Sequence, residues 1–167
     1  MIKHYNFKPF FAIAILFTIQ LIFSINNNSK IKNNYNNDKL ITNEDAHYNA
    51  QSISISPIVD NSITGNIGKL DGIYQISEAN INKNTETAIH ILINANQGKA
   101  KIVLVKPNSE VEILKEVIAK KENSSYNGSI CIHCASGVNK IKLVGENYRG
   151  NFKISQPNGI IFKTKNT

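Results

Sequence analysis

The sequence contains few of the residues on which binding and catalytic sites are most often built. It has no tryptophan and only two cysteines in 167 residues. Carbohydrate-binding modules usually stack sugars on aromatic side chains, often tryptophan, so a tryptophan platform is excluded. A structural zinc site made of four cysteines is excluded as well.

The usual catalytic motifs are also missing. The 12 acidic residues are scattered along the chain. We find no paired carboxylates, no calcium-binding acidic run, no Ser/His/Asp order and no glycine-rich loop that would hold phosphate. We therefore predict that the protein is not an enzyme and that it binds neither a cofactor nor a metal ion.

One stretch is hydrophobic enough to enter a membrane. Met1–Lys8 carries two lysines and no acidic residue, and the following segment Phe10–Phe23 is almost entirely apolar. This order is typical of export signals. We predict that residues 1–25 are an uncleaved transmembrane anchor or a cleaved signal peptide. A buried core helix is the third interpretation. The anchor predicts an extracytoplasmic domain at the cell membrane, and the cleaved signal peptide predicts a secreted domain.

The next segment, residues 26–64, is rich in asparagine and poor in sustained hydrophobic periodicity. Such a segment buries too little apolar surface to offset the entropy lost on ordering. We predict a disordered linker here. Within it, Ser52–Val59 alternates between polar and apolar residues, but Pro57 has no backbone N–H to donate, so at most this is an edge strand.

Residues 65–167 form the predicted domain, because strand patterns follow one another at short intervals. Ile73–Ile81 alternates weakly, while Ala88–Asn94 and Lys99–Val105 alternate clearly and are rich in β-branched residues. Several short strands at this spacing favour an antiparallel β-sandwich, jelly-roll-like or immunoglobulin-like. The predicted fold is therefore all-β, preceded by an N-terminal hydrophobic helix and the linker.

Ser109–Lys121 fits two structures. Ser109 and Glu112 match a helix capping box, and apolar residues recur on one helical face. Against a helix, Pro107-Asn108 directly after a strand is typical of a turn. We favour a hairpin strand.

Gly128–Ile154 has the most regular alternation in the domain. Apolar residues fall on one face of three runs separated by glycines, which predicts an antiparallel meander. The apolar residues are Ile130, Ile132, Cys134, Ile141, Leu143, Phe152 and Ile154, and the glycines are Gly137, Gly145 and Gly150.

Three segments between Lys99 and Ile154 resemble a known group of proteins. The segments are, in chain order, K-I-V-L-V-K-P-N, V-N-K-I-K-L-V-G after a glycine, and Y-R-G-N-F-K-I. They resemble small exported or membrane-anchored β-sandwich proteins of low-GC Gram-positive bacteria. That group has no assigned activity. The resemblance covers about a third of the chain. It implies a sandwich fold and an extracytoplasmic setting, and it identifies no catalytic residue.

Cys131-Ile-His133-Cys134 is the one C-x-x-C motif. Redox motifs of this kind sit at a helix N-terminus, whereas this one lies in a strand, so its two thiols should point to opposite faces. We interpret them as ordinary core or surface thiols. The alternative is a thiol- or metal-dependent envelope protein that uses Cys131, His133 and Cys134, with His90 as a further ligand if its strand is adjacent.

Positive charge is concentrated in the predicted domain, where 14 basic and 8 acidic residues give a net charge of +6. Lys140, Lys142, Arg149 and Lys153 are the predicted binding patch, because a basic surface favours anionic partners. We expect a binding or structural role at the cell envelope, with anionic lipid or wall polymer as the partner and no nucleic acid. The other interpretation is a solvated strand face whose lysines prevent edge-to-edge association.

Overall fold

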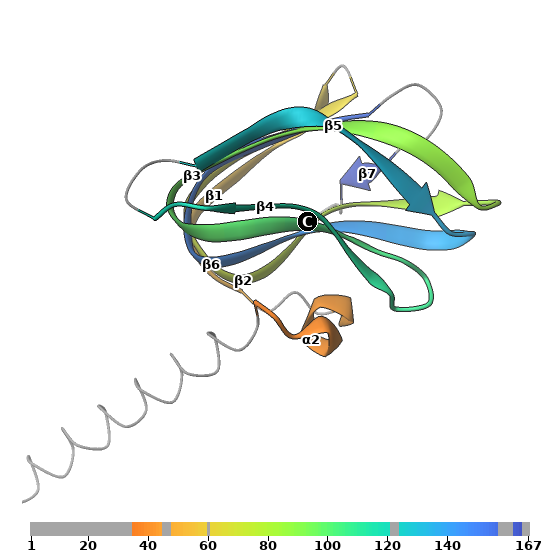
Figure 1. The fold of residues 1–167 in the computed structure, drawn as a ribbon, viewed down its shortest axis with the longest axis horizontal. Helices are drawn as coiled ribbons and strands as arrows, with labels where there is room; N and C mark the ends of the chain where they lie inside the picture. Colours follow the sequence, from red (N-terminus) through yellow and green to blue (C-terminus); the bar gives the residue numbers. More distant parts are fainter. Residues whose placement is uncertain (1–34, 45–47, 60, 121–123, 157–161, 165–167) are drawn as a thin grey trace, which may run out of the picture.

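The computed structural model describes residues 35–44, 48–59, 61–120, 124–156 and 162–164, which form one antiparallel β-sheet and a short helix (Figure 1). The predicted all-β class is confirmed. The hydrophobic segment Phe10–Phe23 and the part of the linker before Tyr35 lie outside the described residues. Within these ranges, no helix combines the length and the hydrophobicity needed to cross a bilayer.

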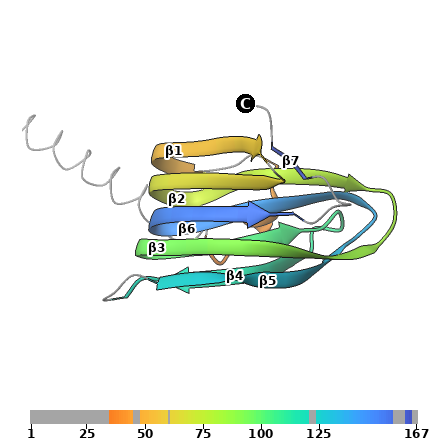
Figure 2. The same cartoon turned by 90° about the horizontal axis from the view of Figure 1, so that it is seen from above.

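The sheet is built around three long strands. In chain order the elements are α2 (Asp38–Thr42), β1 (Tyr48–Val59), β2 (Ser62–Ile81), β3 (Thr85–Val105), β4 (Val111–Ile118), β5 (Ser124–Cys134), β6 (Gly137–Ser155) and β7 (Lys163–Thr164). The strand order is β1-β2-β6-β3-β4, while β5 also pairs with β3 and β7 with β2. Thus β6 lies between β2 and β3, as Figure 2 shows from above.

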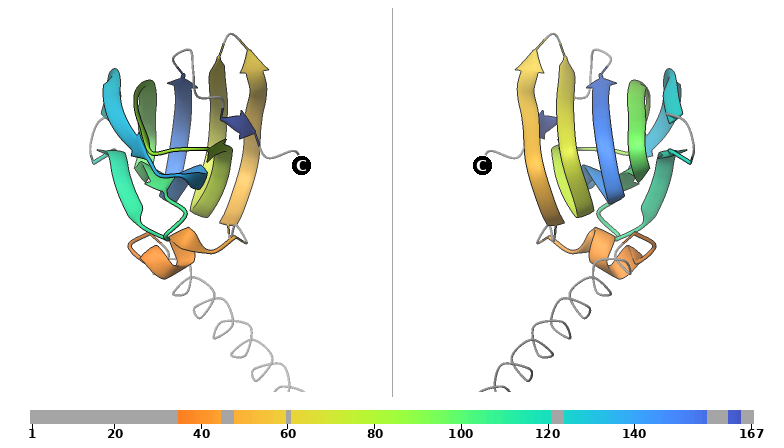
Figure 3. Two further views of the ribbon diagram at one scale, coloured as in Figure 1. Left: turned by 90° about the vertical axis from the view of Figure 1, so that its right-hand side faces the viewer. Right: turned by 90° about the vertical axis from the view of Figure 1, so that its left-hand side faces the viewer.

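The sheet folds over itself because β2, β3 and β6 each bend and run through two facing layers (Figures 1 and 3). The upper layer of Figure 1 contains most of β1, the first half of β2, the last part of β6, the first half of β3, and β5. The lower layer contains the other halves of the long strands and β4. The predicted sandwich therefore forms from one continuous sheet rather than from two separate ones.

Irregular pairing marks the bend. The β3–β6 register shifts twice between Ala95 and Lys99, and Gly98 adopts a φ of 68°. Opposite it, Asn147 has a φ of 49°, a conformation that asparagine tolerates better than most residues. A side chain at Gly150 would collide with the backbone oxygen of Asn94. These residues let the strands turn sharply while remaining paired, as β-bulges do.

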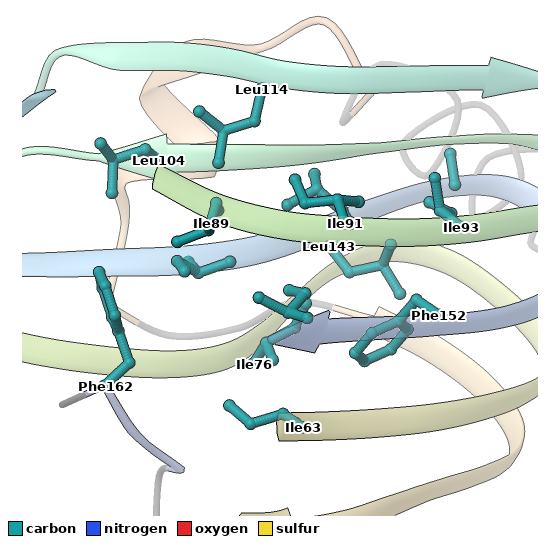
Figure 4. Packing of buried hydrophobic residues seen from close by; sticks show 14 of the residues in the cluster. Ile63, Ile76, Ile89, Ile91, Ile93, Leu104, Leu114, Leu143, Phe152 and Phe162 are labelled. Carbon is teal, nitrogen blue, oxygen red and sulfur yellow. The ribbon is translucent and has the colours of Figure 1, made fainter. Parts of the chain in front are cut away.

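The main core lies between the two layers, and isoleucine is its most common residue (Figure 4). Ile63, Ile154 and Ile91 stand in one register row of the upper layer, and all three are buried. Their β-branched side chains suit a pleated sheet that is buried on one face. Tyr148 is also buried, and its hydroxyl donates to the Asn94 oxygen at 2.9 Å. Burial raises the pKa of Tyr148.

A second, smaller core lies outside the lower layer, where α2 covers it. Its buried members are Tyr35, Ile41, Ile73, Val103, Val105 and Val144. The hydroxyl of Tyr35 donates to Glu116 Oε1 at 2.6 Å, and the ammonium groups of Lys99 and Lys101 lie over the Tyr35 ring at 4.3 and 4.8 Å. These contacts hold the segment 35–44 against the sheet.

The sheet therefore begins earlier than the predicted boundary at Gly65. Residues 35–44 are docked, and β1 with the start of β2 occupies most of the second half of the predicted linker. The disordered-linker prediction is wrong for these residues, because Tyr35 and Ile41 bury their side chains against the sheet. The edge-strand prediction for Ser52–Val59 is confirmed, since β1 is the first strand in the order.

Two strand predictions are corrected and one is confirmed. The two strands predicted over Ala88–Asn94 and Lys99–Val105 are the two halves of one long strand, β3. The predicted meander is wrong, because Gly145 and Gly150 lie inside β6 and β5 pairs with β3 instead of β6. These glycines accommodate close backbone approaches at the bend rather than turns. Ser109–Lys121 contains the expected hairpin strand, β4.

Candidate functional site

The outer surface of the upper layer is a polar array, called the polar face below. It consists of three register rows: two cross β1, β2, β6, β3 and β5, and the third crosses β2, β6, β3 and β5. Leu92 is the one apolar residue among those named here. The rows are Ser54, Asn66, Asn151, Asn94 and Ser125; Ser56, Thr64, Lys153, Leu92 and Asn127; and Ser62, Ser155, His90 and Ser129.

This array follows from strict alternation. Between the polar rows lie rows that point into the core, such as Ile63, Ile154 and Ile91. Rows on one face repeat about every 6.7 Å and strands are about 4.8 Å apart, so the polar face extends over about 13 Å by 19 Å. It is a broad surface of hydroxyl and amide groups.

Hydrogen bonds between neighbouring strands hold several of these side chains in place. Asn94 Nδ2 donates to Asn151 Oδ1 at 2.8 Å. The His90 ring lies between two residues of β5, with Nε2 at 2.7 Å from Asn127 Oδ1 and Nδ1 at 3.2 Å from Ser129 Oγ. Amide and hydroxyl groups have more than one donor or acceptor position, so these bonds leave capacity for a ligand.

A groove of about 420 Å³ lies at the bend end of the polar face. It is lined by Ser52, Ser54, Asn66, Ile67, Gly68, Asn96, Arg149, Gly150 and Asn151. Arg149 Nε donates to the Gly68 oxygen at 2.9 Å, which orients the guanidinium while its terminal N–H groups stay available. Among the described residues, no carboxylate forms an ion pair with Arg149 or Lys153.

The four predicted patch residues do not form one surface. Lys142 is 1% exposed, and its Nζ donates to the Ile41 and Asn43 oxygens at 2.6 and 2.7 Å. Lys140 pairs with Glu44 at 3.2 Å in the same region. These two lysines therefore lie on the lower layer beside α2.

Arg149 and Lys153 lie on the other side of the bend. Arg149 lines the groove at the end of the polar face, and Lys153 belongs to one of its rows. The predicted single patch is wrong because β6 passes through both layers, which separates residues that share one strand.

The thiols take the positions that strand alternation predicted. Cys131 is exposed, Cys134 is buried, and both are free. Cys131 Sγ donates to Glu86 Oε1 at 2.9 Å, and this bond raises the pKa of the Cys131 thiol. Burial raises the pKa of Cys134. The strands of His90 and His133 are adjacent, but these residues pair with Ser129 and Glu86, so the two histidines lie four register positions apart.

Sequence reasoning missed most of the polar face. The alternation S-I-S-I-S in β1 signals one polar side, but Asn66, Asn94 and Asn151 come from three distant segments. Glu86 was also missed, because it lies 45 residues from Cys131 in the chain.

The comparisons with known proteins do not assign a function. No family model and no curated protein matches the chain. Among solved structures, a mutant of a family 29 carbohydrate-binding module has a TM-score of 0.36 at 11% identity and covers 68% of this chain and 74% of its own.

Two further structures are similar at the same level. Bacteriophage CBA120 tailspike protein 4 gives a TM-score of 0.38 at 8% identity, over 72% of this chain and 19% of its own. Murine APRIL gives a TM-score of 0.34 at 9% identity, and the match covers 67% of this chain and 97% of its own. At these identities and TM-scores the likenesses carry no argument about this chain.

Proposed function

We propose that the protein is a non-enzymatic, extracytoplasmic binding domain that is tethered to the membrane through Phe10–Phe23. Its ligand is a hydroxyl-rich, anionic polymer of the cell envelope, and the polar face is the binding surface. The observation that supports this proposal is the array of amide and hydroxyl side chains across five strands, with the cations Arg149 and Lys153 and no acidic residue in its rows.

The chemistry of the surface fits such a ligand. Asparagine and serine side chains both donate to and accept from sugar or polyol hydroxyls. Arginine binds phosphate or carboxylate through paired N–H groups, and lysine binds them as a point charge. Arg149 and Lys153 are four residues apart on β6, which corresponds to about 13 Å along the strand. Two anionic groups of one polymer chain would reach both cations.

The position of α2 favours a polymer over the lipid surface. Eleven residues lie between Phe23 and Tyr35, and the twelve Cα–Cα steps allow at most about 43 Å from the anchor to the docked segment. That segment packs on the lower layer, whereas the polar face is the outer surface of the upper layer. The described chain therefore starts on the layer opposite the polar face, which leaves the polar face free to meet a polymer on the side away from the anchor.

The test uses the full chain reconstituted in vesicles of neutral phospholipid. A soluble sugar-phosphate polymer prepared from wall material should bind, and binding should weaken as salt rises because exposed charges are screened. Neutral dextran is the control for hydroxyl binding alone. Capture of vesicles made of anionic phospholipid, with no binding of the polymer, would contradict the proposed partner.

A further inference from the structure

Three metal-ligating side chains converge beside the polar face. Glu86 lies near the start of β3, and Cys131 and His133 lie near the end of β5. His133 is the register partner of Glu86, and Cys131 is the partner of Ala88. All three side chains are exposed on the same side of the sheet. Since residues two apart in a strand share one face, the β5 pair is aligned toward Glu86 by the strand itself.

The donor atoms lie close to the spacing that metal coordination requires. Cys131 Sγ lies 2.9 Å from Glu86 Oε1, and His133 Nε2 lies 3.3 Å from Glu86 Oε2. One donor atom from each residue lies within 4.8 Å of the other two. Zn–S bonds of about 2.3 Å and Zn–N and Zn–O bonds of about 2.0–2.2 Å place tetrahedral ligands about 3.4–3.6 Å apart. Small side-chain rotations would bring the three donors to that spacing.

We propose that Glu86, Cys131 and His133 bind a divalent transition metal ion of the zinc class. A thiolate ligand selects against magnesium and calcium, which prefer oxygen ligands, and the imidazole suits zinc. Three protein ligands leave one position of a tetrahedral site open. Glu86 and His133 also line a pocket of about 380 Å³, which gives an external ligand access to that position.

This site differs from the one that the C-x-x-C motif suggested. Cys134 is buried and points to the opposite face from Cys131, so it does not contribute. Glu86 takes its place and comes from the neighbouring strand. The inference does not depend on polymer binding, since none of the three residues belongs to the rows of the polar face.

The experiment is a Co²⁺ titration of the reduced full chain in detergent, followed by competition with Zn²⁺. We expect one Co²⁺ per chain with a thiolate-to-cobalt charge-transfer band, and displacement by Zn²⁺, which binds such sites more tightly than Co²⁺. Cys131→Ser should abolish the band. Glu86→Gln and His133→Gln should each weaken Co²⁺ binding by at least about tenfold, since even outer-shell partners of metal ligands matter at that level.

Cys134→Ala and His90→Gln are the matched controls, one for the second thiol and one for an exposed histidine on β3. Both should keep the band and the affinity. The three ligands are exposed, so their variants should fold, and circular dichroism checks this. The proposal is overturned if no thiolate band forms at one equivalent of Co²⁺, if the Cys131→Ser protein retains the band, or if the Cys134→Ala protein loses it.

Discussion

Lys142 is buried beneath the docked segment 35–44, and we expect it to be the main polar link between that segment and the sheet. Its ammonium donates to the Ile41 oxygen at 2.6 Å and to the Asn43 oxygen at 2.7 Å. The perturbation is Lys142→Met, which keeps the length of the side chain and removes its charge. The matched control is Lys140→Met, which removes a lysine from the same face of the same strand.

The expected magnitude follows from these contacts. Hydrogen bonds from a charged donor contribute about 1.5–3 kcal/mol each, and leaving a buried carbonyl unpaired costs about 1–3 kcal/mol. Removing the charge also removes its desolvation cost, which is several kcal/mol. We expect undocking of the segment to become easier by about 3 kcal/mol, on the order of 100-fold in its opening equilibrium. The exposed Lys140–Glu44 pair should contribute no more than about 1 kcal/mol.

Hydrogen exchange of the amides in residues 35–44 measures this opening directly. Limited trypsin digestion at Lys39, which is exposed in α2, gives a second readout. In Lys142→Met, exchange and cleavage should both accelerate while the amides of β3 and β6 in the upper layer stay protected. If residues 35–44 exchange as slowly in Lys142→Met as in the unmodified protein, the proposed role of Lys142 is refuted.

Two further predictions concern the bend and the exposed thiol. Gly150→Ala should lower the thermal midpoint by several degrees, because the new methyl group would collide with the Asn94 oxygen; Gly128→Ala, which meets a movable side chain, should change it much less. Glu86→Gln should lower the raised pKa of Cys131, so that more thiolate is present at pH 8 and alkylation is faster. An unchanged midpoint in Gly150→Ala, or an unchanged alkylation rate in Glu86→Gln, would contradict these accounts.

The sequence predicts the strands of this fold far better than their partners. Alternation identifies β4 within Ser109–Lys121 and both halves of β3, because a half-buried strand imposes a period of two on its own residues. It does not say which strand lies next to which. That β6 lies between β2 and β3 depends on contacts across most of the domain. Glycines at a bend and glycines at turns also look alike in sequence.

For the site residues too, local spacing predicts some positions, whereas others depend on contacts between distant segments. Opposite faces for Cys131 and Cys134 follow from their spacing alone, and the structure agrees. Lys142 has the pattern of a surface residue, and only the docking of α2 buries it. Glu86 joins Cys131 through strand pairing over 45 residues, which local patterns do not reveal.

The central claim is that the polar face binds an anionic, hydroxyl-rich polymer, and the double variant Arg149→Gln/Lys153→Gln tests it most directly. Charge-assisted hydrogen bonds contribute about 1.5–3 kcal/mol each, so its affinity for the soluble sugar-phosphate polymer should fall by at least about tenfold. Lys140→Gln, on the lower layer, should bind like the unmodified protein. Equal affinity of the double variant and the unmodified protein would contradict the account.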